Sequence, residues 1–388
     1  MLKRVLLLAV FGISLMQLSC ASKDNSEPPA PLTRIEKAIP LYTEWKIDAG
    51  EGIDTASYNM QPLLNQGQIF SVDTLGMVTS VNAESGRVNW TSFTRLAAIT
   101  GLAGGEGVVI ASSKNGDLVA YDVEDKNLRQ RWAIRLKGEI RAAPVIVDEQ
   151  VFVRTVDGKL SALSLLDGAI QWAVSRRVPA LSLTGNSRPL IAGKLVIVGF
   201  DDGKISAFSR KDGQTLWEVT VSNPSGRTEI ERLVDLDGQF IFRDGIIYIS
   251  SYQGRLAAIQ AIDGNVLWSR KFSSYQSIDA DEEALYLSSD DSHIWSIDRR
   301  TGTAFWKQEV LHARKITAPM VIGENLVVAD LEGYVHWFDK SDGTLLGRVR
   351  PTENRYIAKP VKWLDKVILI DSDGILSSVR FDDRHFKR

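Results

Sequence analysis

The sequence predicts an all-β protein, an eight-bladed β-propeller of four-stranded blades that is closed by a strand from the N-terminal region. Three observations lead to this fold. One phrase recurs along the chain: an apolar run, a turn with Gly, an alternating strand, a second turn and a Trp. Its first turns are 38 to 51 residues apart, close to the period of propeller blades. No long segment has apolar residues at helical spacing. The first-turn positions are Gly76, Gly116, Gly158, Gly203, Gly254, Ser292, Gly333 and Gly374.

Each copy of the phrase contains four expected strands. In the third copy, residues 143–155 supply two strands, residues 159–165 the third and residues 169–175 the fourth. Six copies end in a Trp, and the position four residues after the first turn is small in seven of the eight, as expected where a large ring must dock. These Trp residues are Trp90, Trp132, Trp172, Trp217, Trp268 and Trp306. The small residues are Ser80, Ala120, Ala162, Ala207, Ala258, Ser296 and Ser378.

The last two copies depart from the pattern. The eighth copy has no fourth strand of its own, but residues 41–47 form an orphan strand that carries Trp45. This strand is expected to complete the eighth blade and to close the ring. In the seventh copy Trp337 stands at the small position and Gly347 at the Trp position, which suggests a volume-conserving exchange across one packing site.

The N-terminal region is predicted to be processed and lipidated. Residues 1–19 have two basic residues and then an apolar stretch too short to span a bilayer, which is typical of an export signal. Cys20, the single cysteine, follows directly and resembles the lipidated cysteine of bacterial lipoproteins. In such lipoproteins an Asp directly after the cysteine typically causes retention at the inner membrane. This chain has Ala21 there, which implies that the protein is located at the outer membrane. The alternative is a plain secreted protein with a chance cysteine. Residues 20–38 are expected to be a polar, Pro-containing tether, and residues 39–388 the propeller.

Composition and motifs do not favour an enzyme. The chain has 46 basic and 48 acidic residues and a net charge of −2, so it lacks the excess of basic residues that is typical of nucleic-acid-binding proteins. Its four histidines form no recognised metal motif, and no nucleophile motif appears. The glycine-rich residues 101–107 are interpreted as a turn between blades, and the acidic residues 279–284 as a solvated loop. We therefore expect no catalytic residue, no metal site and no cofactor.

Two irregular connections are the candidate functional site. Residues 178–189 carry Leu181 and Leu183, and residues 222–239 form an insertion that contains Glu229, Glu231, Arg232, Asp235 and Asp237. Apolar side chains beside a charged rim are typical of a protein contact. The alternative is that the leucines are tucked beneath the loop.

The repeat resembles the tryptophan-docking repeat of pyrroloquinoline-quinone dehydrogenase propellers. It also resembles that of the BamB family, lipoproteins of the outer-membrane β-barrel assembly machine, which use the same repeat without the quinone. A vicinal disulfide, which the quinone enzymes use, is impossible with one cysteine. Residues 179–187 and 228–238 look like the BamB family specifically. This resemblance implies a periplasm-facing scaffold that docks on a POTRA domain of BamA. The contact residues it implies are Leu181, Leu183, Thr184, Arg232, Asp235 and Asp237.

Two other functions stay open at this point. The outer strand of each blade could hold unfolded outer-membrane proteins by edge pairing. A function of a different class is that of a periplasmic small-molecule-binding or sensor propeller, which would use the central channel. The fold alone does not separate these functions. A cluster of polar groups in the channel would favour a ligand, and a patch around Leu181 and Asp235 would favour docking.

Overall fold

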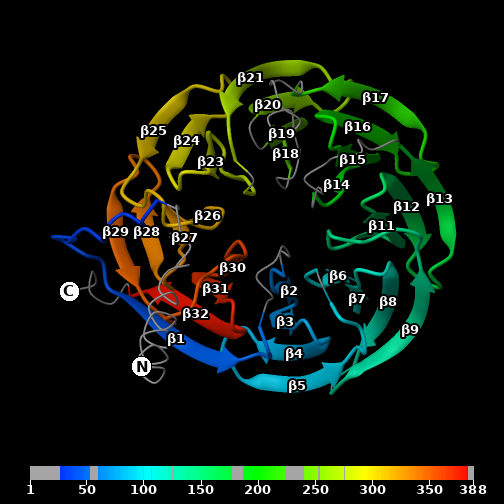
Figure 1. Cartoon of the computed structure of the whole chain (residues 1–388), viewed down its shortest axis with the longest axis horizontal. Helices are drawn as coiled ribbons and strands as arrows, with labels where there is room; N and C mark the ends of the chain where they lie inside the picture. The colour runs from blue at the N-terminus through cyan, green and yellow to red at the C-terminus, as the bar shows by residue number, and fades with distance from the viewer. Residues whose placement is uncertain are drawn as a thin grey trace, which may run out of the picture.

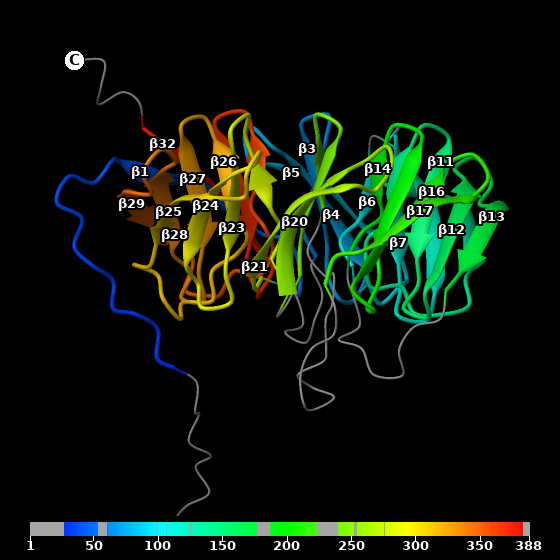
Figure 2. The same ribbon diagram turned by 90° about the horizontal axis from the view of Figure 1, so that it is seen from above.

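The structure is a computed structural model that describes residues 27–52, 60–98, 100–105, 107–124, 126–176, 187–222, 240–251, 254–274 and 276–382. These residues form eight antiparallel four-stranded sheets. The sheets are arranged as a ring with the first strand of each nearest the centre (Figure 1), and the ring is a flat disc from the side (Figure 2). The predicted eight-bladed propeller is confirmed. Within the described ranges, no helical segment has the length and hydropathy to cross a bilayer.

Blades 1 to 4 run in chain order from centre to rim. Blade 1 has β2 (Leu63–Asn65), β3 (Gln68–Val72), β4 (Met77–Asn82) and β5 (Val88–Phe93). Blade 2 has β6 (Ala103–Gly105), β7 (Val108–Ser112), β8 (Asp117–Val123) and β9 (Leu128–Arg135). Blade 3 has β10 (Val145–Val147), β11 (Gln150–Arg154), β12 (Lys159–Ser164) and β13 (Ile170–Ser175). Blade 4 has β14 (Leu190–Ala192), β15 (Leu195–Gly199), β16 (Lys204–Ser209) and β17 (Thr215–Thr220).

Blades 5 to 7 repeat this order, and blade 8 takes its outer strand from the start of the chain. Blade 5 has β18 (Ile241–Arg243), β19 (Ile246–Ser250), β20 (Gly254–Gln260) and β21 (Val266–Phe272). Blade 6 has β22 (Asp279–Ala280), β23 (Ala284–Ser288), β24 (Ile294–Asp298) and β25 (Ala304–Gln308). Blade 7 has β26 (Met320–Ile322), β27 (Asn325–Ala329), β28 (Val335–Asp339) and β29 (Leu345–Val349). Blade 8 has β30 (Val361–Trp363), β31 (Lys366–Ile370), β32 (Ile375–Phe381) and β1 (Leu41–Asp48).

The ring closes as the orphan strand predicts. Strand β1 pairs antiparallel with β32, and Trp45 lies directly opposite Ser378. The side chain of Lys366, which is 1 % exposed, reinforces this closure. Its Nζ lies 2.8 Å from Glu44 of β1 and 2.9 Å from Glu84 of blade 1. One buried ammonium group of β31 therefore links the closing strand to the rest of blade 8 and to blade 1.

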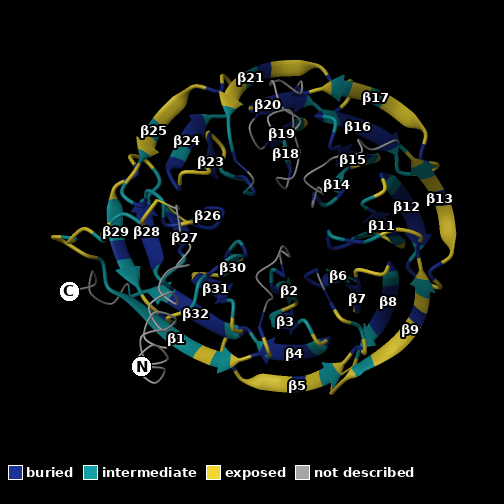
Figure 3. Ribbon diagram, viewed as in Figure 1, coloured by how far each residue is buried: buried dark blue, intermediate teal, exposed yellow. Residues whose placement is uncertain are grey.

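Burial explains why the middle strands carry the apolar runs. The second and third strands of each blade are buried between neighbouring sheets, whereas the outer strands alternate and face solvent (Figure 3). The innermost strands have only two or three residues, too few for a readable pattern. Two sequence interpretations are wrong for this reason: residues 103–105 are strand β6, and the acidic stretch opens with strand β22.

Five of the six regular Trp residues join their blade to the next one by a hydrogen bond. Trp172 lies opposite Ala162 in blade 3 and donates a hydrogen bond from Nε1 to the carbonyl of Arg210 in blade 4, over 3.0 Å. A Cβ on Gly213, whose φ is +74°, would lie 2.6 Å from Cε3 of Trp172. Only glycine fits this close approach and this backbone conformation. Trp132, Trp217, Trp268 and Trp306 donate equivalent hydrogen bonds to the following blade.

Blade 7 has the large and the small residue at the predicted positions, but the two do not exchange volume across one packing site. Trp337 lies opposite Gly347 and is 1 % exposed. The space beside Gly347, however, is filled by the chain that enters β1. A Cβ on Gly347 would lie 2.9 Å from Cγ1 of Ile39 and 3.0 Å from Cδ1 of Leu41. Blade 8 has no hairpin turn between β32 and β1 on which a Trp at position 347 could dock, so a small residue is required there.

The two faces of the ring carry different connections. The face with the turns between second and third strands also carries the connections between successive blades, and we call it the linker face. The opposite face carries the other hairpin turns, among them those with Leu166 and Ile262. Asp73, Asp330 and Asp371 stabilise turns on the linker face, because one carboxylate oxygen of each accepts two backbone N–H groups.

Candidate functional site

The residues predicted to contact a partner lie outside the described residues. They are Leu181, Leu183, Thr184, Arg232, Asp235 and Asp237, and the predicted lipidation site Cys20 also lies outside. The described chain does place the ends of both connections. Arg176 and Ser187 bound the first connection, and Ser222 and Phe240 bound the second. All four ends are on the linker face, on either side of blade 4.

The return of the first connection is held by a buried ion pair. Arg154 of blade 3 donates from Nη2 to Asp201 of blade 4 over 2.9 Å and from Nη1 to Ser187 Oγ over 2.8 Å. The side chains of Arg154 and Asp201 are only 4 % and 1 % exposed. Two charges at such depth require each other, because removing one leaves the other desolvated and unpaired. Ser187 is therefore held at the junction of blades 3 and 4.

The start of the first connection is tied to the strand that leads into the second. Arg176 approaches Glu218 of β17 within 2.6 Å and donates to Ser206 Oγ over 2.7 Å. Its guanidinium also stacks on the ring of Phe200, 4.5 Å from the centroid. Burial opposes ionisation of Glu218, but the hydrogen bond from Lys204 and the charge of Arg176 outweigh it and lower its pKa. Glu218 is thus an anion at neutral pH.

The second connection leaves blade 4 from a turn that is equally well held. The backbone N–H groups of Val221 and Ser222 both donate to the carbonyl of Gly203, over 2.9 and 3.2 Å. At its return, Phe240 is buried beside β18. Blade 4 therefore presents two neighbouring connections from a fixed base. The second runs from residue 221 to residue 240 and is the longest connection between blades.

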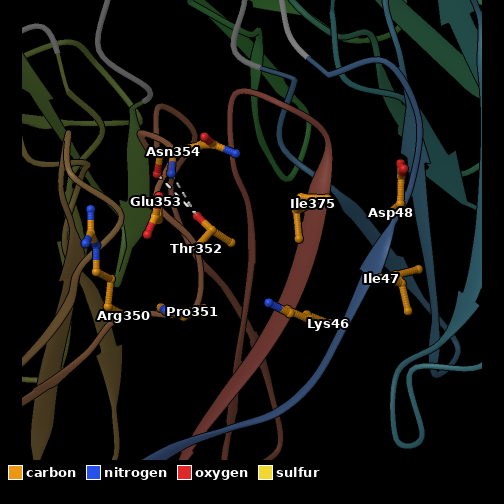
Figure 4. Close-up of a pocket in the computed structure, with 9 residues that line it drawn as sticks. All are labelled: Lys46, Ile47, Asp48, Arg350, Pro351, Thr352, Glu353, Asn354 and Ile375. Carbon is orange, nitrogen blue, oxygen red and sulfur yellow. Dashed lines mark hydrogen bonds between the residues drawn. The ribbon is translucent and has the colours of Figure 1, made fainter.

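A cleft on the linker face lies away from this base. It is lined by the end of β1 and by residues 350–354 and 375. The side chains of Lys46, Arg350 and Asp48 lie apart and do not converge on a common point (Figure 4). Asn354 is already engaged, because its Nδ2 donates to Asp371 over 3.1 Å. The cleft therefore does not have the convergent polar groups of a small-molecule site.

Several charged groups at the inner rim of the ring make contacts with other blades. Asp279 of β22 lies 3.4 Å from Nζ of Lys359 and accepts the backbone N–H of Val321 over 2.9 Å. Arg243 of β18 donates to the carbonyl of Ala280 over 2.8 Å. The contacts of Asp279 with Val321 and of Arg243 with Ala280 join neighbouring blades, and that of Lys359 reaches from the connection before blade 8 to blade 6.

A buried polar cluster between blades 6 and 7 holds the segment that precedes β1. Arg314 and His336 both hydrogen-bond Asp330, over 2.7 and 2.9 Å, and all three are at most 2 % exposed. Burial lowers the pKa of His336 and opposes ionisation of Asp330, but the hydrogen bond from His336 and the charge of Arg314 lower the pKa of Asp330. Arg314 also donates to the carbonyl of Ala30 over 2.9 Å.

Further contacts continue along this segment. Arg348 donates to the carbonyl of Thr33, and the N–H of Ile39 donates to the carbonyl of Leu346 over 2.9 Å. The segment thus lies along blade 7 before it becomes β1, and in Figure 2 it runs down the outside of the ring. From the sequence this segment is predicted only as a polar tether. Its hydrogen-bond partners Arg314 and Arg348 are 284 and 315 residues away in the chain, so no local sequence pattern indicates these contacts.

Comparison with known proteins gives consistent results. The sequence profile described as "Outer membrane protein assembly factor BamB" matches residues 74–308. A protein of that name from Alkalilimnicola ehrlichii is 35 % identical over 98 % of this chain and 98 % of its own length. The crystal structure of BamB from Moraxella catarrhalis superposes with a TM-score of 0.80 at 24 % identity, covering 88 % of this chain and all of that one.

An enzyme with the same fold is a more distant structural neighbour. The quinohemoprotein alcohol dehydrogenase of Comamonas testosteroni superposes with a TM-score of 0.69 at 11 % identity. The alignment covers 88 % of this chain and 76 % of the dehydrogenase. Identity at this level shows a shared fold and carries no argument about activity.

Proposed function

Because the chain belongs to the family of outer membrane protein assembly factor BamB, we propose that it is a non-enzymatic scaffold of outer-membrane protein assembly. In this proposal the linker face around blade 4 docks on a POTRA domain of BamA. The contact is made by Leu181 and Leu183 of the first connection and by Asp235 and Asp237 of the second. Thr184 and Arg232 complete the proposed set of contact residues.

One observation carries this proposal: the two predicted contact segments lie before and after the same blade, blade 4, and their bases are held together. The Arg154–Asp201 pair holds the return of the first segment, and the Arg176–Glu218 pair links its start to the strand before the second. A base fixed in advance reduces the ordering cost of binding. Apolar side chains presented beside carboxylates then give a surface with an apolar centre and a polar rim.

The proposal includes a lipid anchor at Cys20 that holds the propeller at the outer membrane, facing the periplasm. Residues 27–30 reach the ring at His312 and Arg314, in the connection between β25 and β26. This connection is also on the linker face. The anchor and the docking surface would therefore be on the same side of the disc. Attachment to the membrane would then also orient the docking surface.

The docking proposal is tested by co-purification of BamA from membranes. Joint replacement of Leu181 and Leu183 by Ala, or of Asp235 and Asp237 by Ala, should reduce recovered BamA by roughly 10-fold or more, because central apolar anchors dominate interface energies. The matched control is Leu166→Ala with Ile262→Ala, two leucine-sized residues that are each 76 % exposed on the opposite face. Undiminished recovery with both loop variants would show that the contact lies elsewhere.

The rim of the ring supports a second role, the transient holding of unfolded outer-membrane proteins. Leu216 of β17, Leu267 of β21 and Phe305 of β25 each precede the docking Trp of their blade and are 50, 45 and 55 % exposed. They form an apolar row on three neighbouring outer strands. An extended chain could pair with such an edge and place alternate side chains on the row.

This second role is tested with photoreactive side chains at the row. Probes at positions 216, 267 and 305 should crosslink unfolded outer-membrane protein more strongly than probes at 89, 131 and 171. The latter are the equivalent positions of blades 1 to 3, where Asn89, Arg131 and Gln171 stand. Equal crosslinking at both sets, or none at either, would argue against a specific holding surface.

A further inference from the structure

Two histidines from neighbouring blades face each other on the linker face. His293 lies just before β24 in blade 6, and His312 lies in the connection that leads to blade 7. Nε2 of His293 is 3.0 Å from Nδ1 of His312. The ring of His293 is largely buried, with 8 % of the residue exposed. This contact has no part in the docking proposal.

A carboxylate stands at the far nitrogen of each ring. Asp291 lies 2.8 Å from Nδ1 of His293, and Glu27 lies 3.0 Å from Nε2 of His312. A carboxylate at one imidazole nitrogen favours the tautomer with its proton on that nitrogen. Glu27 therefore leaves a lone pair on Nδ1 of His312. Nδ1 of His293 is buried and has no hydrogen-bond partner among the described residues. A proton on that nitrogen places the second lone pair on Nε2 of His293, 3.0 Å from Nδ1 of His312, and a cation between the two lone pairs would satisfy both.

We propose that His293 and His312 bind one divalent transition-metal ion of the zinc class, with the ion between Nε2 of His293 and Nδ1 of His312. Imidazole suits zinc, and metal-bound histidines characteristically donate their other N–H to a carboxylate. Here Glu27 supplies such a carboxylate for His312. Two nitrogens at 2.0–2.1 Å from a tetrahedral zinc are about 3.3 Å apart, so only a small separation of the two rings is needed.

The surroundings can complete the coordination. Asp291, His293 and His312 bring ligand atoms within 4.8 Å of one another. The side chain of Asp291 is 48 % exposed, so it can turn toward the ion and become a third ligand. Water can occupy the remaining position of a four-coordinate site. Two histidines, a carboxylate and water form a ligand set that zinc accepts.

An ion at this position would fasten the N-terminal segment to the ring. The N–H of Ala30 donates to the carbonyl of His312 over 2.9 Å, and Glu27 approaches the same side chain. Fixing His312 therefore fixes the point from which residues 20–26 lead toward Cys20. The site would set how the propeller stands relative to the membrane anchor.

The site is tested by equilibrium dialysis of zinc ions against the untagged mature chain at neutral pH, with Cys20→Ser to remove the thiol. We expect one zinc ion per chain. His293→Asn and His312→Asn should each weaken binding at least 100-fold, and Glu27→Gln roughly 10-fold, in the range observed for the carboxylate partners of metal-bound histidines. His336→Gln, at a buried histidine away from the site, should bind zinc as the parent chain does.

A second readout separates binding here from a folding defect. Zinc should raise the unfolding temperature of the parent chain but not that of His312→Asn, whose side chain is 35 % exposed and can be replaced without opening the core. The proposal is overturned if zinc does not bind at one ion per chain. The two histidines would then be joined by a hydrogen bond between Nε2 of His293 and Nδ1 of His312. It is also overturned if both histidine variants retain the parent affinity.

Discussion

Replacing Trp337 with Ala is expected to lower the free energy of unfolding by about 3–5 kcal/mol, as loss of a buried Trp does. Trp337 is fully buried between blades 7 and 8, in a cluster with Val327, Val335 and Leu369. Urea unfolding measures the change. Trp172→Ala removes a regular docking ring that is 9 % exposed and is the comparison, and the two losses should be similar.

The double variant Trp337→Ala/Gly347→Trp distinguishes two explanations of blade 7. If the two positions simply shared one packing volume, the second change would restore stability. The structure predicts that it does not, because Ile39 and Leu41 already occupy the space beside Gly347. A double variant as stable as the parent chain would contradict this explanation. A loss near zero for Trp337→Ala alone would contradict the assignment of Trp337 to the core.

Replacing Trp45 with Ala should cost about 3 kcal/mol, at the lower end of the range for buried Trp. Trp45 lies on the closing strand and docks on blade 1, where a Cβ on Gly86 would lie 2.4 Å from Cγ of its ring. Trp45 thus packs blade 8 against blade 1 in the same way that Trp172 packs blade 3 against blade 4. Its Nε1 has no hydrogen-bond partner among the described residues, so we expect a smaller loss than for Trp172.

The neighbouring residue provides the control for this change. Lys46 is exposed on the same strand, and Lys46→Ala should alter the free energy of unfolding by less than about 0.5 kcal/mol. If Trp45→Ala cost no more than Lys46→Ala in urea unfolding, then closure by β1 would not stabilise the ring. If it cost as much as expected, both ends of the chain contribute to one cooperative unit.

Much of the fold is predictable because each blade is specified locally. The spacing from Gly203 to Trp217 is enough to place two turns, a strand and a docking ring, and it holds in repeat after repeat. It even identifies Ser292, which has φ +66° at the position where the other seven copies have glycine. The innermost strands β6 and β22 were misinterpreted, because two or three residues carry no periodicity.

Contacts between distant residues were not predictable in the same way. The Arg314–Asp330–His336 cluster and the buried Lys366 are polar residues inside the ring, which a pattern of apolar residues does not indicate. The facing of His293 and His312 depends on the junction of two blades, and their spacing matches no metal motif. The lengthened connections beside blade 4 were visible from spacing alone, and their predicted contact residues stay a prediction.

Site-specific crosslinking in cells tests the central claim most directly. A photoreactive side chain at position 183 or 235 should crosslink BamA through its POTRA region. The same probe at position 166, on the opposite face, should not. If position 166 crosslinks BamA and positions 183 and 235 do not, then the partner binds the other face of the propeller, and the function does not reside in the two connections beside blade 4.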